Sequence, residues 1–100
     1  MNILSTYSNE VKQLCDTHEV RSLFAFGSVT TERFNANSDI DFVVDIADND
    51  PLSYSDKYFD LKSRLEELFK RKIDLLEQKT ISNPYLKARI DQTKVLVYGK

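Results

Sequence analysis

The spacing of apolar residues along the chain predicts three amphipathic helices. In residues 2–18, apolar side chains recur three and four positions apart, so one face of a helix would lie on a sheet. A second, longer helix is predicted to start with a capping box at residues 53–56 and to end in the basic run at residues 70–72. The third is predicted to follow an N-cap at Asn83 and to continue to about Gln92.

Short apolar runs between these helices predict the strands of one sheet. Residues 23–26 form a run that is too short for a helix, while residues 39–46 are rich in β-branched and aromatic side chains. Residues 72–77 and 95–98 predict a third strand and a short fourth one. We therefore expect an α/β fold of the α+β kind, with a small mixed sheet of three to four strands and helices packed on it.

Gly27 ends the first predicted strand, and the one other glycine of the chain, Gly99, is next to last. Glycine allows a positive φ, and its missing Cβ lets a ligand approach the main chain closely. If residues 29–33 then open a helical turn, the free N–H groups of that turn and the Ser28 hydroxyl would face one spot that suits a phosphate. An ordinary turn is the structural alternative, because a single glycine-serine pair is weak evidence.

Three aspartates on the predicted strands are candidate metal ligands. Asp39 and Asp41 alternate along one strand and therefore share one face, roughly 7 Å apart, whereas Ile40 points into the core. Two carboxylates this close repel each other, and a bound divalent cation such as Mg²⁺ relieves the repulsion. Asp74 interrupts the apolar third strand; if that strand neighbours the second, it would add a third oxygen ligand for one or two metal ions. On their own, Asp39 and Asp41 could equally be acids on a solvent-facing strand.

Together these residues resemble the signature of the DNA polymerase beta-like nucleotidyltransferase superfamily. Gly27-Ser28 is followed by ten residues and then by Asp39-Ile40-Asp41, with Asp74 on a later strand. The chain length matches the minimal branch of the superfamily. Similar segments at residues 72–75 and 83–85 extend the resemblance over nearly the whole chain.

The resemblance implies a small α/β core and a role for each residue of the site. The acidic positions Asp39, Asp41 and Asp74 would bind two magnesium ions, and Asp74 would also help to deprotonate the acceptor hydroxyl. The glycine-serine turn would hold the phosphates of ATP. The candidate nucleotide contacts are Gly27, Ser28, Ser38 and Arg33.

The residues after Ser28 depart from the family pattern. Many members carry a base there, as in Gly-Ser-x-Ala-Arg-Gly, whereas this chain has Val29-Thr30-Thr31-Glu32 and then Arg33 as the only nearby base. Ser38 has an alternative role, in which its hydroxyl fixes its own loop through a hydrogen bond to the backbone. The departure bears on catalytic competence more than on the fold.

Family members of this size resemble the antitoxins that are paired with HEPN-type ribonuclease toxins, some of which transfer AMP from ATP to a tyrosine of the toxin. We therefore expect a single minimal nucleotidyltransferase domain over residues 1–100, with ATP and magnesium as substrate and cofactor and a HEPN-type toxin as the partner. Two alternatives stay open. One is an antitoxin that neutralises its partner by binding alone, and the other is a nucleotidyltransferase that acts on a small molecule.

Charge and composition narrow the partners and the compartment. A net charge of -2 and a pI near 5.3 argue against direct binding of nucleic acid, which rests on lysine and arginine neutralising phosphates. No apolar run approaches membrane-spanning length. The single cysteine, Cys15, cannot form an internal disulfide, so we expect a cytoplasmic location and a buried, apolar role for this side chain. A homo- or hetero-oligomer is compatible with the sequence.

Overall fold

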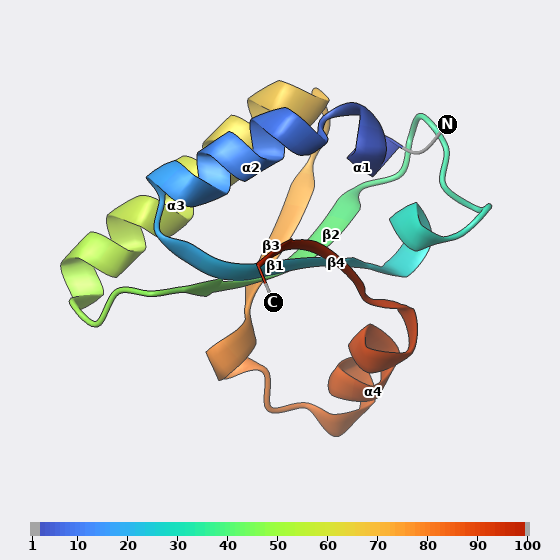
Figure 1. The fold of residues 1–100 in the computed structure, drawn as a ribbon. Helices are drawn as coiled ribbons and strands as arrows, with labels where there is room; N and C mark the ends of the chain where they lie inside the picture. The colour runs from blue at the N-terminus through green and yellow to red at the C-terminus, as the bar shows by residue number, and fades with distance from the viewer. Residues whose placement is uncertain (1–2, 100) are drawn as a thin grey trace.

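The computed structural model describes residues 3–99 of the chain. Within them it contains helices, strands and 3-10 turns, drawn in chain order in Figure 1. They are α1 (Ile3–Thr6), α2 (Ser8–Thr17), β1 (Val20–Phe26), η1 (Gly27–Thr30), β2 (Ile40–Ile46), α3 (Pro51–Phe69), β3 (Ile73–Glu77), η2 (Gln78–Thr80), α4 (Pro84–Thr93) and β4 (Val95–Gly99). None of these helices combines the length and the apolar character needed to cross a membrane.

The strands form one four-stranded sheet in the order β3-β2-β1-β4. β1 pairs antiparallel with both β2 and β4, while β2 and β3 run parallel, with α3 as the crossover between them. The predicted mixed sheet with packed helices is confirmed. Each predicted strand is present, and its ends differ from the expected ones by at most three residues.

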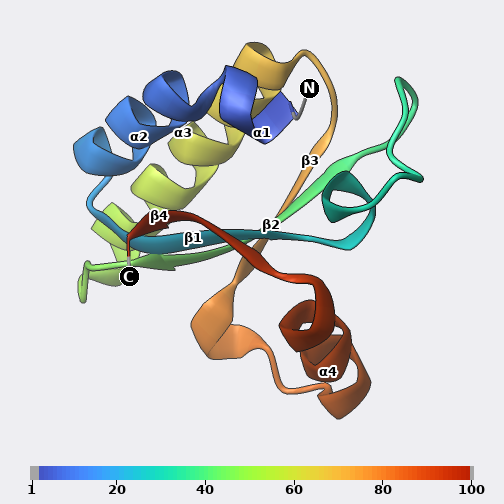
Figure 2. The same cartoon turned by 45° about the vertical axis from the view of Figure 1, so that its right-hand side comes forward.

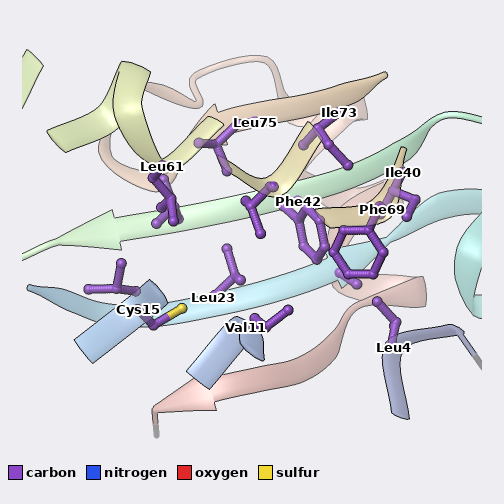
Figure 3. Close-up of a cluster of buried hydrophobic side chains, with 14 of the residues drawn as sticks. Leu4, Val11, Cys15, Leu23, Ile40, Phe42, Leu61, Phe69, Ile73 and Leu75 are labelled. Carbon is purple, nitrogen blue, oxygen red and sulfur yellow. The ribbon is translucent and has the colours of Figure 1, made fainter. Parts of the chain in front are cut away.

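One face of the sheet carries most of the apolar core (Figure 3). Leu23, Phe42 and Ile73 of the strands point to this face and pack with Val11 of α2 and Leu61 of α3, all of them fully buried. Figures 1 and 2 show α1, α2 and α3 together on this side of the sheet. The main core therefore lies between this face of the sheet and these helices.

A smaller apolar cluster holds α4 to the opposite face of the sheet (Figure 2). Phe26 of β1, Val43 of β2 and Ile90 of α4 are buried together there. The predicted third helix and its Asn83 N-cap are thus confirmed. Because side chains alternate along a strand, Asp41 points to the same face as Val43, so α4 and the acidic residues share one side of the sheet.

The prediction of one continuous helix over residues 2–18 is wrong, because the structure has two helices there. Tyr7 separates α1 from α2, with φ -107° and ψ 17°. Its ring packs edge-on against Phe69 of α3, with 5.2 Å between the ring centroids, so packing against α3 overrides the helical spacing at this point. Asn2 of the predicted helix lies outside the described residues.

The predicted start of the second helix is also wrong. α3 begins at Pro51, before the expected capping box at residues 53–56, and Asp50 is its N-cap. The Asp50 carboxylate accepts a hydrogen bond from the Ser53 backbone N–H at 3.0 Å. Proline is favoured at the first helical position, so the same residues end the preceding loop and start the helix.

Candidate active site

Asp41 of β2 and Asp74 of β3 form the centre of the site. They are register partners in the parallel pair, which confirms the predicted adjacency of their strands. The pKa of Asp41 is raised from 3.8 to about 6, first by burial, then by a hydrogen bond with the Asp74 carboxyl and by the negative charge of Asp74. A hydrogen bond between two carboxyls needs a proton on one of them, so this contact forms when Asp41 is protonated and gives way to charge repulsion when Asp41 is ionised.

Asp39 directly precedes β2 and is exposed. The negative charge of Asp39 raises the pKa of Asp41 further, whereas the positive charge of Arg89 lowers it. Among residues 3–99, no three His, Cys, Asp or Glu side chains are grouped closely enough to enclose a metal ion. Mg²⁺ usually takes one or two protein carboxylates together with water and substrate phosphate, and the Asp41–Asp74 pair with Asp39 beside it fits this requirement.

Gly27 brings the end of β1 against the carboxylate of Asp41. It has φ +76°, a conformation that favours glycine, and a Cβ at this position would lie 2.7 Å from Asp41 Oδ2. Both the backbone conformation and the close approach of the Asp41 carboxylate therefore favour glycine at this position.

The turn after β1 differs from the expected one. The 3-10 turn η1 spans Gly27–Thr30, whereas a helical turn was expected at residues 29–33. Two side chains close it: the Thr30 hydroxyl donates to the Gly27 carbonyl at 2.7 Å, and the Thr31 hydroxyl donates to the Ser28 carbonyl at 2.9 Å. Threonine side chains that bond back to the preceding carbonyls stop the helix after one turn.

The Gly27 N–H is not free. It donates to the Thr93 hydroxyl oxygen at the end of α4, at 3.1 Å, and the Thr93 hydroxyl in turn donates to the Arg89 carbonyl at 3.0 Å. The structure therefore ties α4 to the turn that was expected to present this N–H to phosphate. Ser28, the next residue, is half-buried beside the same turn.

The loop between η1 and β2 holds the two remaining candidate contacts. The Ser38 hydroxyl oxygen accepts a hydrogen bond from the Asn35 N–H at 3.1 Å, which is its alternative role in fixing the loop. Arg71 holds the same loop, because its guanidinium donates to the Ser38 carbonyl at 2.8 Å. Arg33 is exposed, and among residues 3–99 its side chain forms no ion pair with an acid. A nucleotide role for Ser38 and Arg33 stays a prediction.

Sequence reasoning missed Arg89 and Thr93, both on α4. A Cβ on Gly27 would lie 3.9 Å from Arg89 Nη2 and 2.7 Å from Asp41 Oδ2, so the guanidinium and the carboxylate both lie close to this glycine. The apolar spacing in this segment predicts a helix but carries no information on which face of the sheet the helix covers. Because α4 covers the face that carries Asp41, Arg89 lies close to this acid.

Comparison with known proteins identifies the family of this site. The family model of polymerase beta nucleotidyltransferases matches residues 9–100. The chain belongs to this family. A protein of Methanocaldococcus jannaschii that is provisionally named a protein adenylyltransferase is 36% identical to this nucleotidyltransferase. The alignment covers 86% of this chain and 85% of the relative. A second protein of that organism with the same provisional name is 31% identical over the same shares of the two chains.

Solved structures show the same fold. A minimal nucleotidyltransferase, also provisionally named, superposes with a TM-score of 0.72 at 25% identity, over 92% of this chain and 90% of the other. A toxin-antitoxin structure with AMP-PNP has a TM-score of 0.72 at 22% identity, over 93% of this chain and 73% of the other. The complex of a tri-AMPylated HEPN toxin with its MNT antitoxin from Shewanella oneidensis has a TM-score of 0.68 at 19% identity, over 98% of this chain and 74% of the other.

Proposed function

We propose that this nucleotidyltransferase transfers AMP from ATP to a tyrosine hydroxyl of a HEPN-type toxin, with magnesium as cofactor, and so acts as the antitoxin of the pair. The observation that carries the proposal is the Asp41–Asp74 carboxyl pair placed against the side-chain-free backbone of Gly27. Paired carboxylates beside a backbone position without a side chain are suited to nucleotidyl transfer, in which positioning and charge neutralisation provide most of the catalysis.

Each of the three aspartates has a role in the proposed reaction. Asp39 and Asp41 hold the magnesium ions, which when bound neutralise the charge on the transferred phosphate. Asp74 accepts the proton of the attacking hydroxyl and completes the metal site. The bond from the acceptor oxygen to the α-phosphorus forms, the bond from that phosphorus to the β-phosphate oxygen breaks, and pyrophosphate leaves.

The choice of partner rests on the relatives. Two of them carry the provisional name of protein adenylyltransferase, and one structural neighbour is an antitoxin bound to a toxin that carries AMP. Within the described chain, Asp39 is exposed and Asp41 is half-buried, so the acidic residues can be approached from solvent. An acceptor side chain on a partner protein has access to such a site.

The test is intact-mass measurement of the toxin encoded beside this chain, after incubation with the purified nucleotidyltransferase, ATP and Mg²⁺. We expect the mass of one or more AMP groups on the toxin, and no such gain with Asp41→Asn. Asp45→Asn is the matched control, because Asp45 lies on the same strand and face but pairs with Arg21 at 3.0 Å. An unmodified toxin with the wild-type protein would contradict the proposal.

A second candidate is an antitoxin that neutralises its partner by binding alone. The hydrogen bond from Gly27 N–H to Thr93 favours it, because this donor is already occupied, and so does the absence of a base at residues 29–31. Binding alone predicts that Asp41→Asn still neutralises the toxin in cells while the toxin mass stays unchanged with either protein. AMP transfer predicts that Asp41→Asn neither neutralises the toxin in cells nor increases its mass.

A further inference from the structure

The site needs a positive charge that its own turn does not supply. Nucleoside triphosphates carry several negative charges, and Asp39, Asp41 and Asp74 add more on the protein side. Family members often place a base shortly after the glycine-serine pair, whereas this chain has Val29, Thr30 and Thr31 there. Transferred phosphate in such a site is generally held by cations or by arginine as well as by backbone N–H groups.

Arg89 of α4 lies where that charge is needed. The space above the Gly27 Cα is bounded by Asp41 Oδ2, 2.7 Å from a Cβ built on Gly27, and by Arg89 Nη2, 3.9 Å from it. One carboxylate and one guanidinium thus face the same small volume. The arrangement places a carboxylate and a guanidinium within 4 Å of the point where a Gly27 Cβ would lie.

Two further contacts fix Arg89 in this place. Ile90, the next residue, is buried against the sheet with Phe26 and Val43. One helical turn later, the Thr93 hydroxyl links the Arg89 carbonyl, at 3.0 Å, to the Gly27 N–H, at 3.1 Å. The position of the Arg89 backbone is therefore tied directly to the turn.

The guanidinium itself is available for a ligand. Arg89 is exposed, and in the part of the chain that the structure describes it belongs to no ion pair within 4.0 Å. Its charge is nevertheless felt at the site, since it lowers the pKa of Asp41. A guanidinium offers several donors in a planar fork that matches two phosphate oxygens, which an unpaired arginine beside a metal site is suited to use.

We propose that Arg89 binds the phosphate chain of the nucleoside triphosphate above Gly27, and so replaces from α4 the base that is absent after Ser28. The proposal rests on the proposed nucleotidyl transfer for the identity of the ligand. It assigns to α4 a binding role in addition to its packing role. It also predicts that affinity depends on the number of phosphates, because a guanidinium in this place contacts phosphate and leaves the base and the ribose to other groups.

The test is calorimetric titration of the purified wild-type chain and four variants with the magnesium complexes of ATP and a non-hydrolysable ATP analogue, and with AMP. We expect Arg89→Gln to weaken binding of both triphosphates about 10- to 100-fold and that of AMP less than about threefold. Arg89→Lys should recover part of the loss, because it keeps the charge but not the fork. Lys87→Gln removes the same charge from the same helix and should bind like wild type.

The results that overturn the proposal are specific. Equal triphosphate affinity in Arg89→Gln and wild type would show that Arg89 serves only as a counter-charge to Asp41, and no triphosphate binding by the wild type would equally refute it. A loss in Arg33→Gln with none in Arg89→Gln would assign the contact to the loop. Because binding is measured without a toxin, a wild-type protein that binds ATP but modifies no toxin refutes the proposed function and leaves the role of Arg89 to be decided by the titrations.

Discussion

Replacing Asp41 with asparagine should stabilise the protein in the absence of metal ions while it abolishes the proposed AMP transfer. In the folded chain the pKa of Asp41 is about 6, against an ordinary value of 3.8. The folded protein therefore binds this proton more tightly than the unfolded chain does, so the stability of the metal-free protein falls as the pH rises from about 4 through about 6. Above about pH 6 Asp41 is mostly ionised, so the free-energy cost of burying its charge and the repulsion from Asp74 both destabilise the folded protein.

The magnitude follows from the same values. The difference between 3.8 and about 6, at about 1.36 kcal/mol per pH unit, corresponds to about 3 kcal/mol. Asp41 is half-buried, and solvent screening of its charge reduces the expected effect to about 1 kcal/mol. An asparagine amide can also donate to the Asp74 carboxylate without a shared proton, which adds to the gain.

The assay is urea unfolding in EDTA at about pH 7.5 and about pH 5, followed by circular dichroism. We expect Asp41→Asn to unfold at higher urea than wild type at the higher pH and to show a smaller difference between the two pH values. Asp45→Asn, which removes a surface ion pair with Arg21, should change stability by less than about 1 kcal/mol. An Asp41→Asn protein that is less stable than wild type in EDTA, or equally dependent on pH, would refute the repulsion between the paired carboxyls.

Three other substitutions test the elements that position the site. Gly27→Ala should destabilise the fold by about 2 kcal/mol, measured by urea unfolding, because φ +76° is unfavourable for alanine and the new Cβ would meet Asp41 Oδ2; a stable, active variant would contradict this. Thr93→Val should cost about 1–2 kcal/mol in the same assay, because the Gly27 N–H loses its acceptor, and unchanged stability would show that the bond contributes nothing. Asp50→Ala should lower the thermal midpoint through loss of about 1 kcal/mol from the α3 N-cap and leave ATP binding unchanged, whereas Asp50→Asn should retain most of the cap.

Local pattern was sufficient for the parts of the site that lie on single strands. Asp41 follows Ile40 in a run of alternating side chains, so its place on the face opposite the main core could be predicted from the sequence. The pairing of Asp41 with Asp74 depends on the parallel register of two strands that are separated by a long helix, and sequence spacing sets only the possibility of such a contact.

The parts that sequence could not predict depend on contacts between distant segments. The break at Tyr7 arises from packing on Phe69, and no glycine or proline marks it. The role of α4 depends on the face of the sheet that it covers, which decides whether Arg89 meets the acids or solvent. A helix with one inward stripe can pack on either face, so its neighbours become known only from the complete fold.

The C-terminal part of the described chain connects the edge of the sheet to the Gly27 turn. β4 is an edge strand of the sheet, and it starts two residues after Thr93, whose hydroxyl holds the Gly27 turn. Fraying of this edge would thus loosen the turn beside Asp41, and a nucleotide bound at the proposed site would in turn slow the exchange of amide hydrogens in β4. The protection of a strand remote from the reacting groups would then report whether the nucleotide is bound.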